Sequence, residues 1–165
     1  MVEVYEADGT FVGQFGEETL MDAQDIVAAN KGHIYVLDKF HGSQERCVHE
    51  FNAERKHLGS FRVDPNSISI TFDRGSERTV IVSSRYDPEK AGFLQNVSIY
   101  DSSNAISDNY TSSKLLQRYE LDTVKLLSDA SITVNTEGLI AVVLAQNFKG
   151  TPRGKLVVIE EPKIF

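Results

Sequence analysis

Residues 25–52, DIVAANKGHIYVLDKFHGSQERCVHEFN, decide the fold of this chain. Apolar and polar residues alternate in three short segments, at 25–29, 33–38 and 47–52, and alternation with a period of two is typical of β-strands. Asn30-Lys31-Gly32 separates the first two segments, and asparagine and glycine accept the backbone conformations of a tight turn. The stretch therefore predicts consecutive antiparallel strands joined by hairpins.

The same pattern returns twice further along the chain. Strand pairs like 25–29 with 33–38 are predicted at 67–72 with 79–84 and at 130–134 with 139–144. Outer strands are predicted at 2–6, 11–15, 47–52, 57–61, 96–101, 115–121 and 155–160. A four-stranded unit recurring every ~40–50 residues is the signature of propeller blades.

The predicted fold class is all-β, a partial β-propeller of four-stranded antiparallel blades. The chain supplies about three blades, half of a six-bladed ring. Residues 1–165 form a single propeller segment: 2–15 end one blade, 22–62 form the next, 66–121 form a blade with an insertion at 102–113, and 129–165 form a partial blade.

Three blades are too few to close a propeller ring, so we expect other protein to complete it. Propeller rings usually close with about four to eight blades. An open array exposes sheet edges and an apolar face. We therefore expect either that the chain is part of a larger protein or that a second copy completes a six-bladed ring as a homodimer.

The first full blade resembles the NHL repeat. The resemblance rests on Asp25-Ile26-Val27-Ala28, Gly32, Ile34-Tyr35-Val36-Leu37-Asp38 and Cys47-Val48-His49-Glu50-Phe51-Asn52, and it extends over residues 2–61. The chain departs from the family at Ala23-Gln24-Asp25, where a Pro-x-Gly start is usual, and in the loop after Asp38, which lacks an Asn-His pair. The resemblance implies a non-catalytic interaction module of a multidomain protein such as a tripartite-motif-like ubiquitin ligase.

Charge and composition limit the kinds of partner that the chain is expected to bind. The chain has 17 basic and 24 acidic side chains and a formal charge of -7, which repels phosphate backbones and disfavours nucleic acid. No apolar run approaches the ~18 residues of a membrane helix, so no membrane partner is expected. A single cysteine favours a reducing, cytoplasmic location. Two Asn-x-Ser/Thr triplets, at Asn96 and Asn109, leave an extracellular location open.

Basic and aromatic residues gather in the hairpins 39–46, 85–94 and 146–154, which blade geometry places at one end of the array. The predicted partner-binding residues are Lys39, Phe40, Arg46, Arg85, Tyr86, Lys90, Phe93, Phe148, Lys149 and Arg153. Aromatic and arginine side chains are the usual anchors of protein interfaces. An RNA-binding NHL domain is the alternative, but acidic loops beside these hairpins make the whole end slightly negative, and RNA affinity depends on phosphate neutralisation.

We expect neither a cofactor nor a metal. The histidines at 33, 41, 49 and 57 have no metal-site spacing, although Cys47 and His49 share one face of their strand. Cys47 is interpreted as a small buried apolar residue. A second alternative is a lactonase-like, calcium-dependent hydrolase with Asp25, Asn66 and Asp129 around the axis; turn residues that bind backbone N–H groups are the simpler interpretation.

Overall fold

The computed structural model describes residues 1–40, 45–89, 91–102, 115–121, 129–148 and 151–160, and these residues form thirteen β-strands and one 3₁₀ turn. An N-terminal hairpin, β1 (Val2–Tyr5) and β2 (Phe11–Phe15), precedes the first four-stranded sheet. That sheet contains β3 (Ala23–Ala28), β4 (Ile34–Lys39), β5 (Arg46–Phe51) and β6 (His57–Val63). The turn η1 (Asn30–Gly32) joins β3 to β4.

Two further sheets follow in chain order. The second contains β7 (Ser67–Asp73), β8 (Arg78–Asp87), β9 (Gly92–Asp101) and β10 (Leu115–Leu121). The third contains β11 (Asp129–Val134), β12 (Ile140–Phe148) and β13 (Thr151–Ile159). In each sheet consecutive strands are antiparallel neighbours, and the sheets do not close into a ring. The predicted fold class, an all-β partial propeller of four-stranded units, is confirmed.

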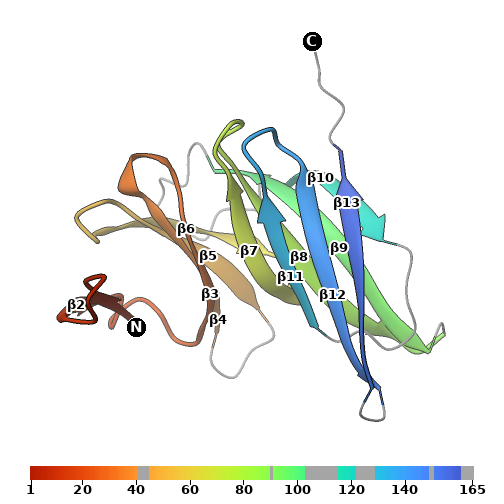
Figure 1. The fold of residues 1–165 in the computed structure, drawn as a ribbon. Coiled ribbons are helices and arrows are strands. Elements are labelled where there is room, and N and C mark those ends of the chain that lie inside the picture. The colour runs from red at the N-terminus through yellow and green to blue at the C-terminus, as the bar shows by residue number, and fades with distance from the viewer. Residues whose placement is uncertain (41–44, 90, 103–114, 122–128, 149–150, 161–165) are drawn as a thin grey trace.

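The sheets stack through their innermost strands. β3 contacts β7, and β7 in turn contacts β11. Figure 1 shows the resulting row of sheets, with the N-terminal hairpin at one side and β13 at the other. This arrangement of first strands side by side is the geometry of blades around an axis.

Apolar layers fill the space between the sheets. Leu37, Val48 and Phe61 of the first sheet pack with Ile70 and Ile81 of the second. On the opposite face of the second sheet, Val82 and Val97 pack with Val142 of the third. The N-terminal hairpin covers the other face of the first sheet through Phe15, which contacts Phe51 edge-on at 4.9 Å between ring centroids.

Asp25 fastens the first sheet to the second. Its carboxylate accepts hydrogen bonds from Ser69 Oγ at 2.7 Å and from the backbone N–H of Ile70 at 2.9 Å. The other carboxylate oxygen accepts the N–H of Ile26 at 2.9 Å. Both oxygens therefore bind the protein itself, one of them across to β7 of the second sheet.

At one end of the array, two hairpins have longer strands and shorter loops than the sequence predicted. Residues 85–94 were expected to be a loop, but the pairing of β8 with β9 continues to Asp87 and Gly92. Tyr86 lies opposite Phe93 in this extension, and their rings meet edge-on at 5.5 Å. An aromatic cross-strand pair stabilises a ladder by about 0.2–1 kcal/mol, which explains why the strands continue. β12 and β13 are extended in the same way.

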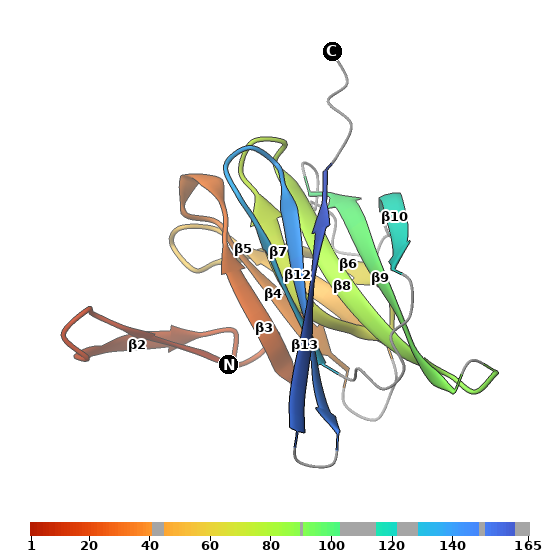
Figure 2. The ribbon, with the colours of Figure 1, turned by 45° about the vertical axis from the view of Figure 1, so that its right-hand side comes forward.

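The outer face of the third sheet is uncovered. Val143, Leu156 and Val158 are 50%, 64% and 48% exposed, whereas Val142 on the inner face is fully buried. Val143 lies opposite Leu156 in the ladder, so the exposed side chains are neighbours. In Figure 2 β13 stands at the front of the array. An apolar sheet face of this kind is typical of an interaction surface.

We predict that Asp25→Ala lowers the free energy of unfolding by about 2 kcal/mol, because it removes a charged acceptor and leaves the Ile70 N–H without its partner. Urea denaturation followed by circular dichroism measures this change. The matched control is Asp8→Ala, whose carboxylate accepts the N–H of Thr10 in an exposed turn; it should cost less than about 0.5 kcal/mol. Equal costs for the two variants would contradict the role of Asp25.

Candidate functional site

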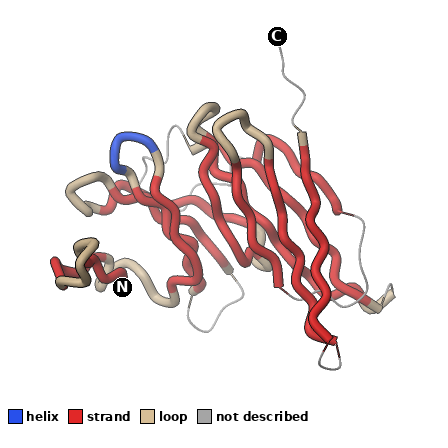
Figure 3. The backbone as a smooth tube through the Cα atoms, viewed as in Figure 1, coloured by secondary structure: helices blue, strands red, loops and turns tan. Residues whose placement is uncertain are grey.

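The predicted partner-binding residues that the structure describes lie in hairpins at the same end of the array. The hairpin ends of β4–β5, β8–β9 and β12–β13 lie on the lower side in Figure 3, and the turns that join β3 to β4, β7 to β8 and β11 to β12 lie on the upper side. Lys39, Phe40 and Arg46 belong to the first hairpin. Phe148 and Arg153 are in strands of the third. Lys90 and Lys149 lie outside the described residues.

The side chains at this end differ in their surroundings. Arg85 and Tyr86 are exposed, and the ring of Tyr86 meets the half-buried Phe93 edge-on. Arg46 is instead engaged by the fold: its Nε donates to the carbonyl of Pro65 at 3.0 Å, and burial lowers the pKa of its guanidinium. The free surface at this end is therefore formed around Arg85 and Tyr86.

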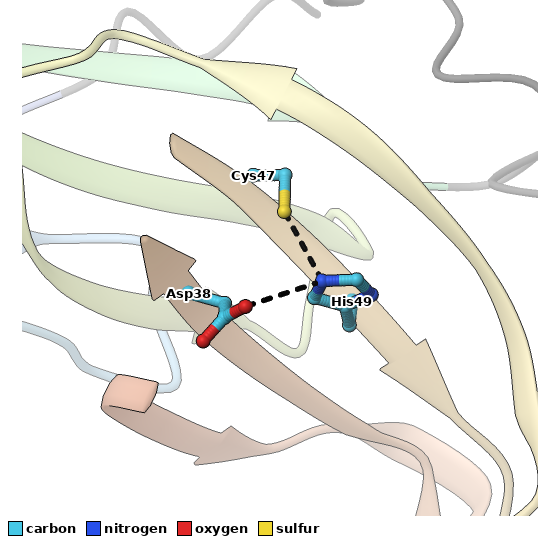
Figure 4. Close-up of side chains that lie close together, drawn as sticks. All are labelled: Asp38, Cys47 and His49. Carbon is cyan, nitrogen blue, oxygen red and sulfur yellow. Dashed lines mark hydrogen bonds and ion pairs between the residues drawn. The ribbon is translucent and has the colours of Figure 1, made fainter. Parts of the chain in front are cut away.

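A second candidate site is a buried polar cluster between β4 and β5 (Figure 4). Asp38 and Cys47 are cross-strand neighbours, and His49 follows Cys47 by two residues, so all three side chains project from one face of the sheet. His49 Nε2 lies 3.1 Å from Cys47 Sγ and 3.6 Å from Asp38 Oδ2. Their exposed fractions are 0% for Asp38 and Cys47 and 3% for His49.

Hydrogen bonds hold this cluster in place. Asp38 accepts the backbone N–H groups of Met21 and Asp22 at 3.0 and 2.8 Å, which anchors the segment that leads into β3. On the other side of the imidazole, His49 Nδ1 lies 3.1 Å from Nε2 of the exposed His57. The cluster thus extends from the incoming backbone to the surface at His57.

The protonation of the cluster follows from these contacts. Burial raises the pKa of the Cys47 thiol to about 12, and the charge of Asp38 acts in the same direction. Burial also opposes ionisation of Asp38, but hydrogen bonds from His49, Met21 and Asp22 outweigh it, and the pKa of this carboxyl is lowered. A protonated, enclosed thiol is a poor nucleophile.

Sequence reasoning found part of this cluster. It placed Cys47 and His49 on one face, which the structure confirms, and it did not single out Asp38 as their neighbour. The signal was present in the hairpin register, because pairing Lys39 with Arg46 places Asp38 opposite Cys47. The sequence does not fix that register, because a loop of several residues between two strands permits more than one pairing.

The opposite face of the first sheet carries a small polar cavity of about 160 Å³. Glu50, which is buried, accepts hydrogen bonds from His33 Nδ1 at 2.7 Å and from the Tyr35 hydroxyl at 3.0 Å. Burial and the neighbouring Glu50 raise the pKa of Tyr35. The ring of Tyr35 stacks on Phe72 of the second sheet at 5.5 Å, so this network also links two sheets.

Two of the residues considered for an axial calcium site, Asp25 and Asn66, make hydrogen bonds to the protein itself. Asp25 binds β7, as described above, and the amide of Asn66 donates to Asp64 Oδ1 at 3.2 Å within a turn. The side chain of Asp129 lies outside the described part of the structure. Asp25 and Asn66 therefore have local structural roles.

Comparison of the chain with protein-family models and with curated proteins finds no match. Across the residues that the structure describes, no helix has the length and apolar character needed to span a bilayer. The assignment of a function therefore rests on the geometry of the described surfaces and clusters.

We predict that Cys47 in the folded, EDTA-treated protein reacts with a thiol reagent at least ~100-fold more slowly at about pH 8 than in denaturant, because its thiol is protonated and enclosed. The release of thionitrobenzoate from Ellman's reagent measures the rate. The same protein in guanidinium chloride is the control, since it contains the same single thiol. A native rate within about tenfold of the denatured rate would show an accessible, activated thiol.

Proposed function

We propose that this chain is a non-catalytic, NHL-type β-propeller module that binds a protein partner at the end formed by the β4–β5, β8–β9 and β12–β13 hairpins. The observation that carries the proposal is the exposed aromatic and basic surface at Arg85 and Tyr86, with Phe93 packed behind Tyr86. Tyrosine and arginine contribute most of the binding energy in many protein interfaces.

The role of Asp38 supports the NHL-type assignment. In the resemblance, this residue ends the Ile-Tyr-Val-x-Asp strand, and here its carboxylate accepts two backbone N–H groups from the segment before β3. An aspartate at this position thus fixes the entry of the chain into its own blade. That is a structural reason for the aspartate at the end of this motif, independent of catalysis.

Charge favours protein over nucleic acid as the partner. The formal charge of the chain is -7, and an acidic field weakens binding to phosphate. Asp64, in the loop before β7, forms an ion pair with Arg118 at 3.5 Å from Nη2 to the carboxylate. The positive charge of Arg118 is therefore partly neutralised and attracts phosphate less strongly. A neutral or basic protein surface meets less repulsion here than an RNA backbone.

We predict that a photo-crosslinking phenylalanine analogue at position 86 captures a protein from extracts of the native host and that the same analogue at position 5 does not. Tyr86 and Tyr5 are 54% and 53% exposed, so the two probes are equally accessible and differ only in the part of the protein surface on which they lie. With the captured protein purified, Tyr86→Ala should weaken binding at least about tenfold. Tyr5→Ala should change it less than about twofold.

Two outcomes would contradict the proposal. Identical capture at positions 86 and 5 would mean that the hairpin end is not a specific surface. Tight RNA binding that weakens steeply with salt and with Arg85→Ala would favour the RNA-binding alternative.

The uncovered face of the third sheet supports a second copy as a further partner. We predict that the isolated chain forms dimers in solution and that Leu156→Glu reduces them to monomers, because it places a charge on the exposed apolar face. Light scattering coupled to gel filtration measures the mass. Leu116→Glu is the control, since Leu116 is also exposed but lies on β10. A folded wild-type monomer would contradict dimer formation.

A further inference from the structure

The buried cluster of Asp38, Cys47 and His49 brings together three different metal-ligating atoms. One carboxylate oxygen, one sulfur and one imidazole nitrogen all lie within 4.8 Å of one another, in a space closed to solvent. Figure 4 shows Cys47 and Asp38 both directed toward the ring of His49, whose Nε2 takes part in both contacts. Oxygen, sulfur and nitrogen from these residue types are the ligands of Zn²⁺ in proteins.

The spacing of the ligands suits a tetrahedral ion. Bonds of about 2.0–2.3 Å from Zn²⁺ to nitrogen, oxygen and sulfur correspond to ligand separations of roughly 3.3–3.6 Å. The separation of His49 Nε2 from Cys47 Sγ is 3.1 Å, and that from Asp38 Oδ2 is 3.6 Å. The first separation is shorter than this range, and the three atoms lie within 4.8 Å of one another, so the side chains have to move around the ion when it binds.

The outer contacts of the cluster are also those of a metal site. A histidine that binds metal through one ring nitrogen usually donates a hydrogen bond from the other, and ligating carboxylates are hydrogen-bonded in turn. When His49 binds an ion through Nε2, its Nδ1–H is directed at His57 Nε2, 3.1 Å away. Asp38 is held by the N–H groups of Met21 and Asp22.

We propose that Asp38, Cys47 and His49 bind one zinc ion, with His57 as the residue that positions the His49 ring. Zinc replaces the thiol proton of Cys47, which passes to the solvent. The imidazole of His49 binds zinc as the tautomer that carries its proton on Nδ1, so the hydrogen bond from Nε2 to Asp38 is exchanged for two bonds to the ion, and a water molecule that enters with the ion completes four-fold coordination. Hard cations such as Ca²⁺ and Mg²⁺ prefer all-oxygen sites, so the sulfur and nitrogen ligands select a zinc-type ion. The inference is independent of the protein-binding proposal.

The ion would have a structural consequence. The ligands come from β4 and β5, and Asp38 also binds the segment before β3. One ion therefore joins both strands and the incoming chain beneath the N-terminal hairpin. A ligand that binds only the folded state raises the stability of that state.

Cobalt is the probe for this site, because a cobalt–thiolate bond gives a charge-transfer absorption in the near ultraviolet. We expect the EDTA-treated full chain to bind one Co²⁺ per molecule with that absorption, and Zn²⁺ to displace it. Zn²⁺ should also raise the melting temperature, whereas Mg²⁺ should not. Absence of a thiolate–cobalt band in the folded wild-type protein overturns the proposal without any variant.

Variants then identify the ligands. Cys47→Ser should abolish the charge-transfer band, and a band that persists in this variant overturns the proposal. His57→Gln changes an exposed residue, should leave the fold intact and should weaken cobalt binding about 10–100-fold while keeping the band. His33→Gln is the matched control, because His33 binds Glu50 on the opposite face of the sheet. Equal loss of cobalt binding in His33→Gln and His57→Gln would show adventitious surface binding and would overturn the site.

Discussion

The structure depends on one constraint: a β-sheet with apolar side chains on both faces needs a neighbour on each side. The second sheet meets it fully, because Ile70 and Ile81 pack against the first sheet and Val82 and Val97 pack against the third. The contacts run through the innermost strands, β3 with β7 and β7 with β11. Asp25 fixes the position of β7 along β3, because its carboxylate binds Ser69 and Ile70 and apolar packing alone would let the two strands slide.

The same constraint explains the exposed surfaces. The first sheet is covered on one side by the second sheet and on the other by a two-stranded hairpin, through contacts of Phe15 with Phe51. The third sheet is covered on its inner side, and its outer side exposes Val143, Leu156 and Val158. Three sheets in a row leave one apolar face of the described structure without a neighbour, and this is the face that the proposed second copy would cover.

Most of the fold could be predicted from the sequence, because alternation and turn residues are local signals. The strands of the first sheet fall within a few residues of their predicted bounds, and Asn30-Lys31-Gly32 forms the turn expected of it. The extension of β8 and β9 could not be predicted, since the pairing of Tyr86 with Phe93 becomes favourable only when two strands are already aligned. The contact of Asp38 with Cys47 and His49 was out of reach for the same reason, because it needs a register that the loop length does not give.

The two faces of the first sheet show why polar groups are placed where they are. Leu37, Val48 and Phe61 form an apolar layer against the second sheet, where two rigid sheets meet. Asp38 and His49 lie on the other face, where an irregular segment without ladder hydrogen bonds enters β3 and its N–H groups need acceptors. A carboxylate there satisfies two backbone donors that an apolar side chain would leave unpaired, at a cost of about 1–3 kcal/mol for each. Asp38 is therefore required by the way the chain enters the sheet, and the proposed zinc site makes use of a carboxylate that the fold already needs.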